Sequence, residues 1–297
     1  MKFLNNIKAD FKLIFENYGF YVCVAFTMIL CLCGNAYHDM LKNENYSVIT
    51  ILTQFDREML LSDMRFCSYE IIQNVSGDWF SMFLPIISAF TFVPLICDER
   101  ESKALRNVIF RTSKISFYAS KFISACLAGG LAVFIGYSVF AGFACIAFPG
   151  AGQYSKELQS ELMMQLEYIY ADIPHSSFAF LTGLKLIEMF IYGAVCAIPA
   201  IFLTSIMKNK YLVLCIPFFA KYTLTQVCEK LMSNAWADIE HPDVLLGRMA
   251  KIFSPESVSK LFQSSDKQYI LLYYGVLFVL LFAVYLVIQN RRLDCGE

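Results

Sequence analysis

Long apolar runs alternate along the chain with short, strongly charged segments. A helix needs about 20 residues to cross the roughly 30 Å hydrocarbon core of a bilayer. Six runs reach or approach that length: residues 18–37, 79–97, 122–148, 180–207, 211–228 and 268–288. The fifth is the weakest, because Lys221 interrupts it. The pattern predicts an all-α membrane protein with six transmembrane helices in a single membrane domain, residues 1–297.

The residues before the first run follow a helical period instead. Apolar side chains recur every three or four positions, and the lysines fall on the other side; the apolar set is Phe3, Leu4, Ile7, Phe11, Ile14, Phe15 and Tyr18. This spacing is typical of an amphipathic helix lying in the headgroup layer. A solvated lead-in is the alternative interpretation.

The distribution of Lys and Arg predicts the orientation of the spans. Segments 1–17, 98–121, 208–210 and 289–297 hold 13 of the 24 basic residues in about 50 positions. Loops 38–78, 149–178 and 229–267 hold 9 in roughly 110 positions. Because cytoplasmic loops carry the excess of Lys and Arg, both termini and segment 98–121 are expected in the cytoplasm. The three long loops are then outward.

Composition agrees with a bilayer as solvent. The chain is 58% hydrophobic and 16% charged, with a mean hydropathy of +0.54, whereas soluble domains carry about a quarter charged residues. The net charge of −1 argues against a nucleic-acid partner. Most of the 11 cysteines lie inside apolar runs and do not form a disulfide framework.

The motifs of several enzyme classes are missing from the sequence. There is no GxxxxGK[ST] phosphate loop, no HExxH and no GxSxG. The three histidines, His38, His175 and His241, are isolated in the outward loops. No catalytic residue, metal site or cofactor bound by this chain is therefore predicted, and the chain is not expected to be an enzyme.

Ionisable residues inside spans are candidate pathway residues, because they are costly in hydrocarbon. Lys185 and Glu188 are three residues apart and share a helix face, and so do Lys221 and Glu229, eight residues apart. They could line a water-accessible pathway or pair between helices. The alternative, favoured for Lys185 and Glu188, places them at the outer interface with the lysine snorkelling. For Lys221 both interpretations stay open.

The charged insert CDERESKALRNVIFRTSKISFYASK, residues 97–121, separates the second and third runs. Ala104, Leu105, Val108 and Ile109 form one face of a short helix, and polar residues form the other. A loop that only fixed topology by its charge would need no apolar face. The pattern predicts an amphipathic helix at about 99–111 on the cytoplasmic surface.

This insert resembles the cytoplasmic segment between two core helices of ABC-2-type transporter permeases. In that family an acidic residue precedes an apolar and basic helix, a Ser-Arg turn and a lysine that opens the next helix. The matching positions are Glu99 or Glu101, then Leu105, Arg106, Asn107, Val108 and Ile109, then Ser113 and Lys114, and finally Lys121. Lys103 stands where the family has glycine, and Lys114 where it has arginine; Arg111 ends the helix.

The resemblance implies a division of labour between subunits. The helix would be a coupling helix that docks on a separate ATP-binding-cassette ATPase, and ATP would be bound there. Two six-span permeases, this chain paired with itself or a homologue, would form the pathway. An exporter in a bacterial cytoplasmic membrane, with coupling residues at 99–121, is expected.

Two further function classes stay open. A non-transporting polytopic protein, such as a sensor, an assembly factor or an immunity factor, could act through the long outward loops. A secondary transporter could use Lys221, Glu229 or the Lys185–Glu188 pair as coupling groups. An inverted repeat would favour the secondary transporter, and none is visible in the sequence.

Overall fold

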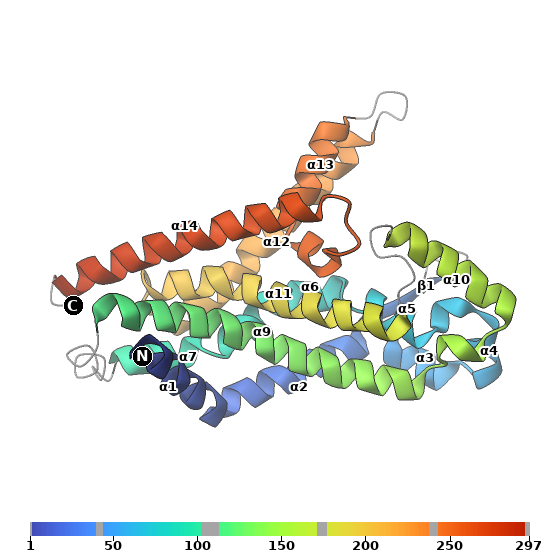
Figure 1. The fold of residues 1–297 in the computed structure, drawn as a ribbon, viewed down its shortest axis with the longest axis horizontal. Coiled ribbons are helices and arrows are strands. Elements are labelled where there is room, and N and C mark those ends of the chain that lie inside the picture. Colours follow the sequence, from blue (N-terminus) through green and yellow to red (C-terminus); the bar gives the residue numbers. More distant parts are fainter. Residues whose placement is uncertain (1, 40–43, 102–112, 171–176, 238–242, 295–297) are drawn as a thin grey trace.

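The computed structural model describes residues 2–39, 44–101, 113–170, 177–237 and 243–294. Most of this part is helical, with the longest helices, α9 (Lys114–Ala147), α11 (Phe178–Thr204) and α14 (Lys267–Asp294), running along the long axis (Figure 1). The start of α1 (Lys2–Glu16) and the end of α14 lie at the same end of this bundle (Figure 1).

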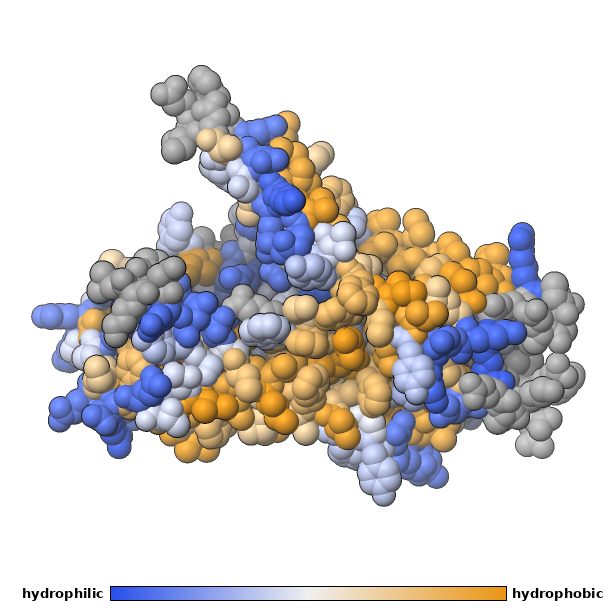
Figure 2. Space-filling view, turned by 180° about the vertical axis from the view of Figure 1, so that it is seen from behind, coloured by the Kyte–Doolittle hydropathy of each residue, from blue (hydrophilic) through white to orange (hydrophobic). Residues whose placement is uncertain are grey.

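Five helical segments of the described chain are long and apolar enough to cross a membrane. They are α6–α7 (Trp79–Arg100), α9 with the residues after it (Lys114–Gln153), α11 (Phe178–Thr204), α12 (Lys210–Ala235) and α14 (Lys267–Arg291). A sixth results if α1 and α2, bent by 66° at their junction, are counted as one span. Figure 2 shows the hydrophobic side chains gathered over the middle of the molecule and the hydrophilic ones at both ends. The protein is a largely α-helical, multi-pass membrane protein.

The first span differs from its predicted boundaries. Helix α2 (Tyr18–Cys33) stops four residues before the predicted end at position 37. Gly34 has extended backbone, and β1 (Asn35–Asp39) then pairs antiparallel with β2 (Glu44–Ser47). With 16 residues, α2 is about 24 Å long, shorter than the roughly 30 Å hydrocarbon core. The β-hairpin therefore begins within residues that the sequence pattern assigned to the first apolar helix.

The second span is broken in its middle. Helix α6 (Asp78–Phe90) and helix α7 (Val93–Glu101) are separated at Thr91 and Phe92. Pro94 lies in the first turn of α7, where the N–H group that proline lacks would have no helical partner. Pro199 and Pro217, by contrast, lie inside the continuous helices α11 and α12.

The loops that the sequence predicts to be outward contain short elements rather than open coil. The first holds α3 (Val48–Gln54), α4 (Arg57–Ser62), η1 (Met64–Phe66) and α5 (Ser68–Asn74). The second holds η2 (Ala151–Gln153) and α10 (Lys156–Ile169), and the third holds α13 (Val244–Phe253) and η3 (Pro255–Lys260). Elements α3, α4, α5 and α10 gather at the end of the bundle opposite the chain ends (Figure 1).

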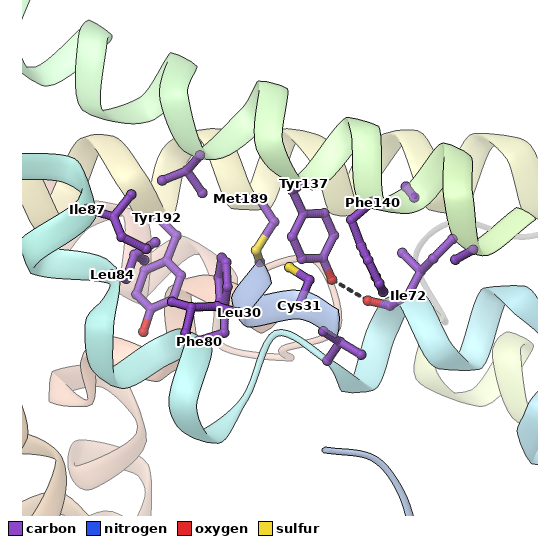
Figure 3. Close-up of a cluster of buried hydrophobic side chains, with 14 of the residues drawn as sticks. Leu30, Cys31, Ile72, Phe80, Leu84, Ile87, Tyr137, Phe140, Met189 and Tyr192 are labelled. Atoms are coloured by element: carbon purple, nitrogen blue, oxygen red, sulfur yellow. Dashed lines mark hydrogen bonds between the residues drawn. The ribbon is translucent and has the colours of Figure 1, made fainter. Parts of the chain in front are cut away.

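Close contacts between helices hold the core together. A Cβ on Gly136 of α9 would lie 2.6 Å from Thr27 Cβ of α2, and a Cβ on Gly193 of α11 would lie 2.9 Å from Gly129 O. Small residues at such contacts let backbones approach, which matters in lipid because lipid offers no hydrophobic drive for association. Around them, Tyr137 donates a hydrogen bond to the Ile72 carbonyl within a buried hydrophobic cluster, whose labelled residues come from α2, α5, α6, α9 and α11 (Figure 3).

Candidate functional site

Lys121, near the start of α9, holds together the end of the bundle from which the insert leaves. Its Nζ lies 2.9 Å from Asp10 Oδ1 of α1 and 2.7 Å from Glu99 Oε2 of α7. All three side chains are mostly buried, with 12% of Lys121 exposed. We call Asp10, Glu99 and Lys121 the basal cluster. Because a partly buried charge needs a partner, the basal cluster fixes α1, α7 and α9 relative to one another.

Arg100, the next residue along α7, reaches a fourth helix. Its Nη1 donates hydrogen bonds to the Thr204 carbonyl at 2.7 Å and the Met207 carbonyl at 3.1 Å. Thr204 ends α11 and Met207 follows shortly after it. Backbone acceptors at a helix C-terminus have no helical donors, so a cation is favoured there. The last turn of α7 is thus bound directly to α9 and to the end of α11, and through Lys121 to α1.

The coupling residues predicted from the sequence are only partly within the described chain. Glu101 ends α7, Ser113 is the N-cap residue of α9, and Lys114 is the first residue of that helix. The remaining positions lie outside the described residues: Lys103, Leu105, Arg106, Val108, Ile109 and Arg111. Glu99 and Lys121, which the sequence places 22 positions apart, are brought into direct contact.

At the other end of the bundle, the Lys185–Glu188 pair fastens a loop. The two charged groups lie 3.7 Å apart and are almost fully buried, so Lys185 does not snorkel to water. Lys185 Nζ donates to the Ser259 carbonyl at 2.7 Å, and Glu188 Oε1 accepts from the Phe262 N–H at 2.7 Å. Both partners belong to residues 254–264, which we call the η3 segment. The ion pair thus binds main-chain groups that would otherwise be unpaired.

Lys221 joins a second polar network that ends on the same segment. Its Nζ donates to the carbonyl and, at 2.8 Å, to the hydroxyl of Ser81 in α6, and it lies 4.9 Å from the centre of the Tyr192 ring. Ser81 Oγ in turn donates to Glu256 Oε1 of η3 at 2.8 Å. Lys221 is therefore buried inside the bundle with partners from α6, α11 and, through Ser81, η3.

Glu229 does not join that network. It is exposed near the far end of α12, where Gln226 Nε2 donates to its Oε2 at 3.1 Å. Lys221 and Glu229 nevertheless line one small pocket between α6, α12 and η3. The structure thus brings the two to the same cavity wall without direct contact.

Several residues of these networks were not singled out in the sequence. Asp10, Ser81, Tyr192 and Glu256 are ordinary polar or aromatic residues with no motif around them. An acidic residue within the amphipathic amino-terminal segment and a serine inside an apolar run were weak signals for two of them. Their partners come from distant parts of the chain, and only the packing of the helices shows this.

The described residues contain neither a grouping of potential metal ligands nor a disulfide. No three His, Cys, Asp or Glu side chains come together there in a way that could hold a metal ion. No two of the ten described cysteines are joined in a disulfide. Comparison of the chain with protein-family models, with curated proteins and with solved structures gives no match.

Proposed function

We propose that this chain is the membrane-spanning permease subunit of an ATP-binding-cassette exporter in a bacterial cytoplasmic membrane. One observation carries the proposal: the basal cluster joins both ends of the charged insert, through Glu99 and Lys121, to helix α1. A segment that only fixed topology would not require a buried three-residue ion network at its base. A segment that a partner protein displaces would require such a network, because the displacement must be passed on to the helices.

The arrangement suits the transmission of movement. The insert leaves from α7 and returns to α9, and Asp10 couples both helices to α1. Arg100 extends the same body to the end of α11. A displacement of the insert by a bound ATPase would thus move four helices together. Discrete arrangements of packed helices, rather than continuous deformation, carry such coupling.

The remaining parts of the proposal follow from the family resemblance. The ATPase is a separate subunit that binds ATP, and the pathway forms between two permeases, two copies of this chain or this chain and a homologue. Both termini and the insert are cytoplasmic. The absence of a phosphate loop from the sequence is compatible with this division of labour.

The test is co-purification with a candidate ATPase encoded next to this chain, followed by measurement of its ATP hydrolysis. We expect the wild-type chain to bind the ATPase and change its activity, and Val108→Asp with Ile109→Asp to abolish both effects. Asn107→Asp is the matched control, because it adds a negative charge to the polar face of the same predicted helix. An ATPase that neither binds the wild type nor responds to the double substitution would refute the proposal.

A second candidate function rests on the outer elements. A cavity of about 530 Å³ lies between the α4–α5 region and α10, with Asp63, Arg65, Glu70 and Glu161 on its walls. Its volume falls in the range of small-molecule sites. This favours a polytopic sensor, assembly or immunity factor that acts through its outward loops. In such a protein, Glu161→Lys would abolish the function of the outward loops, and Val108→Asp with Ile109→Asp would leave it intact. A transporter would show the opposite pattern.

A further inference from the structure

The pocket shared by Lys221 and Glu229 has an excess of acidic groups and acceptors. It has a volume of about 270 Å³ and is formed by α6, α12 and η3. On α12, positions 221, 225 and 229 recur every fourth residue and so share one face of the helix. Trp79 and Tyr222, both about half exposed, add aromatic rings to the wall.

Thr225 has an unsatisfied polar group on this wall. Its side chain is 8% exposed, and its Oγ1 has no hydrogen-bond partner in the described structure. A buried hydroxyl without a partner is costly, and native structures rarely leave one. Thr225 also lines the pocket, so a group bound in the pocket could supply the missing partner.

The charges of the pocket favour a cation as that group. Lys221 directs its ammonium to Ser81 and the Tyr192 ring, and its charge is balanced by Glu256 through Ser81. Among the described residues, no basic side chain lies within ion-pair distance of Glu229; it accepts a hydrogen bond from the amide of Gln226. Carboxylates and aromatic rings both interact favourably with an ammonium group, and this pocket has both on its walls.

We propose that the α6–α12 pocket binds a primary ammonium group attached to an apolar chain. The ammonium would donate to Glu229 and Thr225 Oγ1, and its first methylenes would pack on Trp79. A quaternary ammonium fits less well, because it has no N–H to donate to Glu229 and Thr225. Two sources offer this chemistry: the headgroup of an aminophospholipid and a free amphiphilic amine. The site does not rest on the proposed ATPase partner.

The chain supplies its own reporter for a binding test. It has two tryptophans, and Trp236→Phe leaves Trp79 at the pocket as the single one. The full-length variant is placed in phosphatidylglycerol nanodiscs, and hexylamine is added while Trp79 fluorescence is followed. Hexanol and hexanoate are the matched probes of equal chain length. We expect a saturable change with hexylamine, only a linear partition effect with hexanol, and no saturation with hexanoate.

Two variants and one control assign the response to this pocket. Glu229→Gln removes a hydrogen bond to a charged group and should weaken hexylamine binding about tenfold or more. Thr225→Val should weaken it about fivefold. Thr223→Val is the control, because Thr223 is exposed on the same helix and its hydroxyl donates to the Phe219 carbonyl at 2.9 Å. The Thr223→Val variant should bind hexylamine with the same affinity as the Trp236→Phe protein.

The outcomes separate the alternatives. No saturable response to hexylamine, an equal response to hexanol, or unchanged affinity in both variants would overturn the proposal. If phosphatidylethanolamine in the nanodiscs weakens hexylamine binding by competition, the lipid headgroup is an occupant; if it does not, free amines are. No ATPase or ATP is present, so the result stands apart from that of the transporter test.

Discussion

Lys121 Nζ lies 2.7 Å from Glu99 Oε2, so the last turn of α7 and the first turns of α9 are tied together where the charged insert begins and ends. Asp10 completes the basal cluster from α1, at 2.9 Å. The insert therefore does not hang from two independent helices. Any force on it acts on these three helices and, through Arg100, on the end of α11.

Removal of the central cation should loosen this body. Lys121→Met leaves Asp10 and Glu99 as two mostly buried carboxylates without their shared partner. We expect the free energy of unfolding to fall by about 2 kcal/mol or more. Thermal unfolding of the purified protein measures it. Lys8→Met, which removes an exposed lysine of α1, is the control and should change the midpoint little. If both substitutions lowered it equally, the basal cluster would have no special role. Adding Glu99→Gln to Lys121→Met should recover part of the loss, since the two residues are directly coupled.

The η3 segment should be released when its anchor is removed. In Lys185→Met the Ser259 carbonyl loses its donor and Glu188 loses its counter-charge. Hydrogen exchange of residues 254–264 should then be faster, because local opening no longer has to break a buried ion network. Lys260→Met removes an exposed lysine of the same segment and should leave the exchange unchanged. Equal exchange in the two variants would contradict the anchoring role.

Two glycines of α9 should respond in opposite ways. Gly136→Ala places a methyl group 2.6 Å from Thr27 Cβ, so α2 and α9 must separate. The expected cost is about 1–3 kcal/mol. Gly142→Ala meets no atom within 4 Å and should be neutral or slightly stabilising, because alanine is the better helix former. The midpoints of thermal unfolding compare the two, and a neutral Gly136→Ala would show that α2 does not pack closely here.

Glu70 should make stability fall as pH rises. Burial raises the pKa of Glu70, in α5 outside the spans, above its ordinary 4.5. The folded state therefore holds the proton where the unfolded chain has lost it, and stability is lost between pH 4.5 and the raised pKa. Glu70→Gln should unfold at a higher temperature than the wild type above this window and at the same temperature below it. Glu161→Gln, on the facing wall of the same cavity, controls for the loss of one charge. A difference independent of pH would contradict the prediction.

The sequence by itself determined where the chain is apolar enough to cross a membrane. Hydropathy over about 20 residues is a local property, and five of the six predicted runs correspond to helices long enough to span, although α6 and α7 break the second. The amphipathic period of residues 3–15 likewise appears as helix α1. The end of α2 at Cys33 was not predictable in this way, because residues 34–37 are still uncharged and the β-hairpin that claims them depends on residues 44–47.

Only the tertiary structure decided what the charged residues inside the bundle do. Lys185, Glu188 and Lys221 could be identified as costly in hydrocarbon from their positions alone. Their partners are Ser259, Phe262 and Ser81, which lie 74 to 140 residues away. Because burying a charge is costly, each of these residues must have a partner. Which residue becomes the partner depends on how the helices pack. The same reason explains why the insert's charge pattern was visible in the sequence, while its attachment to Asp10 was not.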